Sequence, residues 1–295
     1  MGRIKREDYV KAIETSLAEY VPEKALPQQK LFNAMRYSLL AGGKRIRPVL
    51  LLEFCGLCGG DQEAALPFAC ALEMVHTYSL IHDDLPCMDD DGMRRGRPSN
   101  HVVFGEAQAL LAGDALLTAA FETMLSEESI NNAGAEKAAA AAGTLAKAAG
   151  AYGMAGGQEI DLESEGQSIS ADMLLKMDEC KTGALILAAA KMGCILAGAD
   201  EKQTAAAVTF AKAVGISFQI VDDILDVSAN EEALGKPVGS DAEKGKSTYV
   251  STMGMEKAQE AVRELTGTAV SALDVFGKDG QYLKNFAGRL ANRKN

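Results

Sequence analysis

Apolar residues recur at every third or fourth position along most of the chain, which is the spacing of amphipathic α-helices. The first such segment, residues 7–20, places Val10, Ile13 and Leu17 on one stripe of a polar helix. A longer segment follows Asp61, a residue suited to capping a helix N-terminus, and runs to Asp83. Further helices are expected at residues 27–41, 104–125, 133–152, 170–197, 203–227, 255–276 and 280–292. The pattern predicts an all-α protein.

Composition supports helices and limits the function. Alanine and leucine are frequent and runs of β-branched residues are few. The net charge of −11 argues against a nucleic-acid-binding protein. Residues 1–10 contain no apolar stretch typical of a secretory signal, and the most apolar segment, 184–199, is interrupted by Lys191 and too short for a bilayer. We expect a cytoplasmic protein without a membrane span.

An acidic stretch at residues 78–98 interrupts an apolar helical run. Five carboxylates stand within nine residues and three arginines follow: Asp83, Asp84, Asp89, Asp90, Asp91, Arg94, Arg95 and Arg97. Carboxylates this close repel one another unless cations neutralise them, and Mg²⁺ prefers such oxygen ligands. Arginine suits a phosphate-bearing ligand. A solvated acidic face is the alternative, but a second acid group recurs at residues 222–226, so the stretch is interpreted as half of a metal–diphosphate site.

The two acid groups differ in helical geometry. Asp222 and Asp226 are one turn apart and project from one face of a helix, with Asp223 beside them. Asp83 and Asp89 would lie about 120° apart on a straight helix. Pro86 lacks an N–H and its ring clashes with the preceding turn, so the helix is expected to break after Asp83–Asp84 and let Asp89 turn back.

His76 precedes Asp83 by two helical turns and shares its face. It is either a core histidine or a ligand contact, and the sequence leaves both open.

Basic residues gather at two other places. The motif GGKRIRP, residues 42–48, sets Lys44, Arg45 and Arg47 at a helix start, where free N–H groups favour anions. A solvated basic loop is the alternative. Residues 228–249 form a lysine-bearing, glycine-punctuated stretch, interpreted as a lid over phosphate, with a flexible linker as the alternative. Since no other stretch resembles a linker, one domain over residues 1–295 is expected.

Two further motifs precede the second acid group. Glycines in GMAGGQEIDL, residues 153–162, are expected to interrupt the helices and leave Gln158 and Asp161 near a turn. Lys181 and Thr182 place a cation beside a hydroxyl group.

Taken in order, six motifs resemble those of the trans-prenyltransferases, the short-chain isoprenyl diphosphate synthases, and are most similar to the bacterial type of farnesyl diphosphate synthase. They are GGKRIRP, HTYSLIHDDLPCMDDDGMRRGRPSNH, GMAGGQEIDL, KTG, FQIVDDILD and LGKPVGSD…KST. The resemblance covers essentially the whole chain. It implies a single-domain isoprenoid synthase fold of about ten or more helices around a central apolar cavity, and a homodimer.

The resemblance also implies a reaction and its residues. Isopentenyl diphosphate would be condensed with an allylic diphosphate through Mg²⁺-assisted ionisation and a carbocation. Three Mg²⁺ ions, with Mn²⁺ as a possible substitute, would be held by Asp83, Asp89 and Asp222, with Asp84, Asp223 and Asp226 in support. Residues implied for the allylic diphosphate are Arg94, Lys181, Thr182, Gln219, Lys236 and Lys246. Residues implied for isopentenyl diphosphate are Lys44, Arg47, His76 and Arg95.

Tyr78 and Ser79, one turn before Asp83, are expected to set product length. The bulky Tyr78 and two extra residues in the acidic motif resemble the fifteen-carbon pattern. A twenty-carbon geranylgeranyl diphosphate synthase, a terpene cyclase and a non-catalytic partner subunit of a heteromeric synthase are the rivals. The second basic set argues against the cyclase, and the two intact acid groups argue against the partner subunit.

Overall fold

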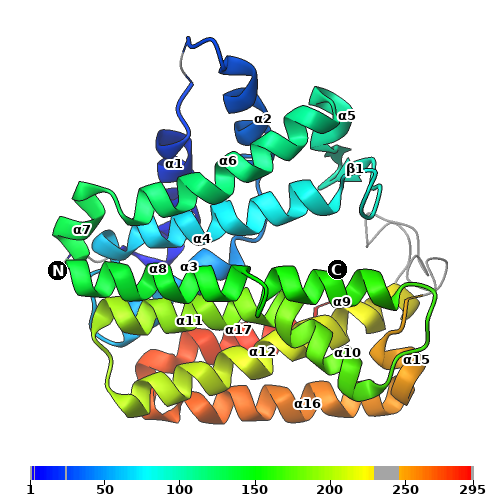
Figure 1. Ribbon diagram of the computed structural model, residues 1–295. Helices are drawn as coiled ribbons and strands as arrows, with labels where there is room; N and C mark the ends of the chain where they lie inside the picture. Colours follow the sequence, from blue (N-terminus) through cyan, green and yellow to red (C-terminus); the bar gives the residue numbers. More distant parts are fainter. Residues whose placement is uncertain (1, 3, 24, 229–245, 294–295) are drawn as a thin grey trace. The chain divides into compact units, whose positions relative to one another are not determined.

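The structure, a computed structural model, describes residues 2, 4–23, 25–228 and 246–293. The described chain consists mostly of α-helices (Figure 1). It divides into two compact units. Unit 1 comprises Met1–Leu145 and Met192–Gly198, and unit 2 comprises Ala146–Lys191 and Ala199–Asn295. Two helices, α8 (Ala135–Ala149) and α11 (Ala184–Ala197), contribute residues to both units. The described chain is mainly helical, as predicted, whereas a single domain stays a prediction.

Unit 1 is built around α4, which is buried over most of its length. Its other described elements are η1 (Arg6–Asp8), α1 (Tyr9–Tyr20), α2 (Gln29–Leu39), α3 (Ile46–Leu57), α5 (Asn100–Phe104), α6 (Glu106–Met124), α7 (Glu127–Ala133), β1 (Met93–Arg94) and β2 (Arg97–Pro98). The central helix α4 (Gln62–Asp83) packs against α6, α3 and α1. Its start is the predicted one, because the Asp61 carboxylate accepts the N–H groups of Glu63 and Ala64 at 3.0 and 3.1 Å.

The predicted stripe of the first helix is wrong at one position. Val10 is 40% exposed, whereas Tyr9 is buried with Ile13 and Leu17. These three residues are four apart and face the core together. The Tyr9 hydroxyl makes burial possible by donating to Glu53 at 3.1 Å and accepting from Gln62 at 2.6 Å.

Unit 2 is built around α12 in the same way. Its described elements are α9 (Met154–Ser164), α10 (Ala171–Asp178), the π-helical turn η2 (Glu179–Gly183), α12 (Glu201–Ser228), α15 (Tyr249–Met253), α16 (Met255–Ala272), η3 (Leu273–Gly280) and α17 (Gln281–Ala291). The long helix α12 packs against α16, α17 and η2. Its core cluster includes Ile220, Val221 and Leu225 from α12 with Tyr249 and Val262.

Three described helices are long and apolar enough to cross a membrane, judged by length and composition alone. They are Gln62–Asp83, Ala171–Ala197 and Glu201–Ser228, and the bent pair α6–α7 would make a fourth if taken as one span. The argument that residues 184–199 are too short is therefore wrong, because most of them belong to the longer helical stretch Ala171–Ala197, which joins α10, η2 and α11. Half to two thirds of each of the three apolar windows is buried inside the protein. The absence of a span stays a prediction.

The helices are interrupted at residues 150–153, which form a turn between α8 and α9, but the expectation that Gln158 and Asp161 lie near a turn is wrong. The motif forms α9, and Gln158 and Asp161 lie on that helix. The glycines serve close packing instead. A Cβ added at Gly157 would lie 2.2 Å from the backbone nitrogen of Lys181 in η2, so only glycine permits this approach.

Replacing Gly157 by alanine should therefore destabilise the protein by about 2–4 kcal/mol. The clash is with backbone, which a rotamer change cannot relieve. Gly143→Ala is the matched control. Gly143 lies inside α8, with no described atom outside that helix within 4 Å of an added Cβ. This control should stabilise by about 0.5–1 kcal/mol. Urea unfolding measures both, and equal effects of the two substitutions would contradict the packing account.

Candidate active site

The acid loop begins where α4 ends. The helix stops at Asp83, as predicted from Pro86. The chain then turns back, because the Asp89 N–H donates to the Asp83 carbonyl at 2.9 Å and the Asp90 N–H donates to the Leu85 carbonyl at 3.2 Å. The backbone of Asp89 is thus brought to the end of the helix that carries Asp83. Both side chains are half-buried.

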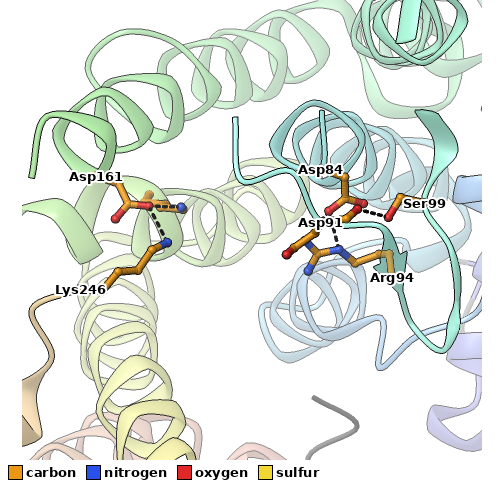
Figure 2. A network of polar contacts seen from close by, with 7 residues as sticks. Asp84, Asp91, Arg94, Ser99, Asp161 and Lys246 are labelled. Atoms are coloured by element: carbon orange, nitrogen blue, oxygen red, sulfur yellow. Dashed lines mark hydrogen bonds and ion pairs between the residues drawn. The ribbon is translucent and has the colours of Figure 1, made fainter. Parts of the chain in front are cut away.

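A buried carboxylate next to this loop holds one of the predicted arginines. Asp84 is 3% exposed and accepts from two nitrogens of Arg94, the Nε at 2.9 Å (Figure 2). Asp91 lies 3.4 Å from the same guanidinium. Burial raises the pKa of Asp84, although Arg94 opposes the shift. Arg94 is therefore positioned by carboxylates, which the sequence analysis did not predict.

A short hairpin presents the next arginine. Strands β1 and β2 pair antiparallel with Arg94 opposite Arg97. The two loop residues, Arg95 and Gly96, have φ of 54° and 73°, which is typical of a type I′ turn. The Arg95 guanidinium donates to the Gly42 carbonyl, and a Cβ on Gly43 would lie 2.8 Å from its Cζ. The Arg-Gly pair between short strands was the missed sequence signal.

A cluster of cations surrounds His76 on α4. A guanidinium nitrogen of Arg47 lies 3.3 Å from His76 Nε2. Burial lowers the pKa of His76 well below its usual value, and Arg47 and Arg95 lower it further. His76 is therefore neutral. Burial also lowers the pKa of Arg47 to about 10. The charge of Glu73 opposes this shift, and the charge of Arg95 adds to it. His76 thus lies among the predicted anion-binding residues rather than in an apolar core.

Only part of the GGKRIRP motif belongs to this cluster. Lys44 is exposed at the start of α3, as predicted. Arg45 instead enters the core, where it is 2% exposed and pairs with Glu73 at 2.7 Å. Arg45 is the N-cap of α3 and has a φ of 46°, in the left-handed region that side-chain-bearing residues rarely adopt. Arg45 is therefore a structural residue.

The two residues expected to set product length lie between His76 and Asp83 on α4. The Tyr78 ring meets the His82 ring edge-on at 5.6 Å between centroids. Burial raises the pKa of Tyr78, and the charge of Asp83 adds to the shift. The Ser79 hydroxyl donates to the His76 carbonyl at 2.9 Å, which occupies it within the helix.

In unit 2, a pocket of about 210 Å³ gathers charged groups of both signs. Lys181 Nζ lies 2.5 Å from Asp161 and Lys246 Nζ lies 3.5 Å from it, the second contact being drawn in Figure 2. Burial alone would raise the pKa of Asp161, but the two lysines lower it below its usual value. Lys181 and Thr182 belong to the π-helical turn η2. Such turns are frequent at functional sites.

The second acid group lies near the C-terminal end of α12. Asp222, Asp223 and Gln219 line the same pocket. Asp223 accepts the Tyr249 N–H at 2.6 Å, and Asp226 is buried at 4% exposure. Asp222 pairs with Arg293, which lies beyond α17. Lys236 and most of the predicted lid fall outside the described residues.

Comparison with known proteins identifies the family. Residues 28–275 match the model of the polyprenyl synthetase family. Farnesyl diphosphate synthase of Geobacillus stearothermophilus is 48% identical over 251 residues, 84% of this chain and 83% of that protein. The "heterodimeric geranylgeranyl pyrophosphate synthase large subunit 1, chloroplastic" of Arabidopsis thaliana is 47% identical over 85% of this chain and 68% of its own length. This chain belongs to the polyprenyl synthetase family and is a prenyltransferase.

Solved structures agree with the predicted fold class. The FPP/GFPP synthase of Zymomonas mobilis has a TM-score of 0.86 at 35% identity, covering 97% of each chain. Geranylgeranyl pyrophosphate synthetase of Pyrococcus horikoshii has a TM-score of 0.89 at 33% identity, covering 98% of this chain and 97% of that one. The all-α isoprenoid synthase fold is therefore confirmed.

Asp178 was missed by the sequence analysis although it lines the unit 2 pocket. It is 5% exposed, and burial raises its pKa to about 7, with Asp161 adding to the shift and Lys181 opposing it. Nothing in the sequence distinguishes Asp178 from exposed acids, because its burial depends on how α10 packs.

Stability should respond to pH through Asp178. An unfolded carboxyl has a pKa of about 3.9, so the folded state holds the extra proton between about pH 4 and 7 and loses stability as pH rises through this window. Asp178→Asn removes this pH-dependent loss of stability, because asparagine does not titrate. The difference between the free energies of unfolding at pH 5 and pH 8 should shrink by about 2 kcal/mol. Urea titrations at both pH values measure it, and an unchanged difference would contradict the assignment.

Proposed function

We propose that the protein joins isopentenyl diphosphate head to tail to an allylic diphosphate, dimethylallyl or geranyl, giving farnesyl diphosphate and releasing diphosphate. The observation that carries this proposal lies on one helix of unit 1. The C-terminal end of α4 carries the Asp83–Asp89 loop, and two turns earlier His76 lies against Arg47. One rigid helix thus positions both the acidic loop, which suits metal ions, and the basic cluster around His76, which suits an anion. This arrangement fits an enzyme that binds metal and diphosphate.

Isopentenyl diphosphate is assigned to Lys44, Arg47, His76 and Arg95. Burial lowers the pKa values of Arg47 and His76, and repulsion between cations adds to this, because Arg95 lowers the pKa of Arg47 and both arginines lower that of His76. A diphosphate would relieve this repulsion and accept hydrogen bonds from both guanidinium groups. His76, kept neutral, would bind without exchanging a proton.

The allylic diphosphate is assigned to a second set of residues: Arg94, Lys181, Thr182, Gln219, Lys236 and Lys246. Asp161 holds Lys181 and Lys246 at the edge of the unit 2 pocket. Ammonium groups fixed in advance stabilise charge that develops on a leaving diphosphate without having to reorganise. Lys181 is proposed as the catalytic cation on this ground.

Mg²⁺ is the proposed cofactor, as three ions held by Asp83, Asp89 and Asp222, with Mn²⁺ as a substitute. The donors fit, because all are carboxylate oxygens near helix C-termini, where the carbonyl dipoles favour cations. Among the described residues no three His, Cys, Asp or Glu side chains form a metal-binding group. Mg²⁺ commonly keeps waters and takes ligands from substrate phosphates. When bound, it would stabilise charge on the departing diphosphate.

The product is proposed to have fifteen carbons. The relatives include both farnesyl and geranylgeranyl diphosphate synthases, so a twenty-carbon product is the alternative. A non-catalytic subunit of a heteromeric synthase is a weaker one, because both acid groups and both basic sets are retained. The bulk of Tyr78 one turn before the acid loop favours the shorter product.

A homodimer in the cytoplasm is proposed as the working form. Four large apolar side chains are exposed on neighbouring turns of α5 and α6: Val102, Val103, Leu110 and Leu111, each between 46% and 56% exposed. A second copy of the chain would cover this apolar surface.

Asp83→Asn should reduce turnover at least 10³-fold while leaving the helical circular dichroism unchanged, because it removes a metal ligand and keeps the side-chain shape. The matched control is Asp90→Asn. Asp90 is exposed with φ of 51°, a conformation that asparagine adopts readily. Turnover is measured with isopentenyl diphosphate and each allylic starter at saturating Mg²⁺. Near-normal turnover of Asp83→Asn would remove the metal role.

Tyr78→Ala should lengthen the product, because a smaller side chain leaves room for a longer prenyl chain. Tyr152→Ala serves as the control, since Tyr152 is 89% exposed. Chromatography of the dephosphorylated products reads out chain length. A product profile shared by wild type and both variants would refute the role of Tyr78.

A further inference from the structure

Arg293 makes a set of contacts with α12 that the proposed reaction does not use. Its guanidinium pairs with the Asp222 carboxylate and donates to the Phe218 carbonyl at 3.2 Å. The same group lies over the Phe218 ring, with Cζ 4.2 Å from the ring centroid. Phe218 and Asp222 are one helical turn apart, so Arg293 lies along one face of α12.

The Arg293 side chain is largely withdrawn from water. It is 11% exposed, whereas that of Asp222 is 46% exposed. Its Nε has no hydrogen-bond partner within the described chain. A buried guanidinium is unfavourable unless a negative charge compensates it. The carboxylate of Asp222 supplies that charge, and the ring of Phe218 adds a cation–π contact.

We propose that Arg293 is an internal counter-ion that competes with divalent metal for Asp222. This inference rests on the proposed function, which assigns Asp222 as a metal ligand. A divalent cation on the Asp222 carboxylate would remove the charge that compensates Arg293 and would repel the guanidinium. Arg293 and the metal therefore exclude one another, and binding of metal at Asp222 requires Arg293 to leave Phe218 and Asp222.

The competition has two consequences. Metal binding at Asp222 requires the ion pair with Arg293 to break, so the free energy of this ion pair is subtracted from that of metal binding. It also ties the segment after α17 to α12 whenever Asp222 carries no metal. Metal binding should thus be coupled to release of residues 292–293 from α12.

Binding of Mn²⁺ alone to the full-length protein at low ionic strength tests the competition, with electron paramagnetic resonance counting the free ion. Arg293→Gln should bind Mn²⁺ about fivefold more tightly than wild type, as expected for loss of a partly buried ion pair. Arg289→Gln is the matched control on α17, since Arg289 is exposed and lies 6.0 Å from the Tyr282 ring centroid. Its affinity should equal that of wild type.

A second readout is thermal unfolding, measured without and with metal. In the presence of a chelator, Arg293→Gln should melt at a lower temperature than wild type, and added Mn²⁺ should raise its melting temperature by more. Arg293→Lys keeps the charge but loses the planar contact with Phe218. Its Mn²⁺ affinity should lie between those of wild type and Arg293→Gln. If Arg293→Gln does not fold, Arg293→Lys still tests the competition between Arg293 and metal.

Asp222→Asn separates this inference from the proposed function. If Asp222→Asn leaves Mn²⁺ binding unchanged, the metal role of Asp222 is wrong and the competition is wrong with it. If Asp222→Asn weakens binding while Arg293→Gln and Arg293→Lys bind as wild type does, the competition alone is overturned. Weaker binding to Asp222→Asn together with tighter binding to Arg293→Gln supports both.

Discussion

Carboxylates collected at the C-terminal ends of buried helices are the constraint on which this structure depends. The central helix of unit 1, α4, ends at Asp83 with Asp84 as its C-cap, and that of unit 2, α12, carries Asp222, Asp223 and Asp226 in its last two turns. The carbonyl dipoles of a helix end already carry partial negative charge, so these acids repel one another and their own helix. Such an arrangement persists only if cations or N–H groups compensate it.

The compensation is local and specific. Arg94 lies against Asp84, the Tyr249 N–H serves Asp223, and Arg293 lies against Asp222. The carboxylates assigned to metal, Asp83 and Asp89, are brought together at the backbone by the turn after Pro86. Three acids, including the proposed metal ligand Asp222, are thus compensated by groups of the protein itself.

Local patterns in the sequence predicted what depends on local chemistry. The 3.6-residue spacing located the long helices, Asp61 marked a helix start, and the ring of Pro86 located the break after Asp83. Prediction failed where the outcome depends on a distant partner. Gly157 looked like a helix breaker because its neighbour, the backbone of Lys181, is not visible in sequence. The sequence does not distinguish Arg45 from its basic neighbours, because its burial depends on the ion pair with Glu73 on another helix. The pairing of Arg293 with Asp222 joins residues 71 apart.

We propose that Asp83, Asp89 and Asp222 hold the metal ions that bind a substrate diphosphate. A crystal structure of the protein with Mg²⁺, isopentenyl diphosphate and an allylic thiolodiphosphate that does not ionise tests it most directly. We expect Mg²⁺ to be coordinated by these three carboxylates and by the allylic diphosphate, with Arg47, His76 and Arg95 around isopentenyl diphosphate. Diphosphates bound without metal, or metal bound away from these aspartates, would contradict it.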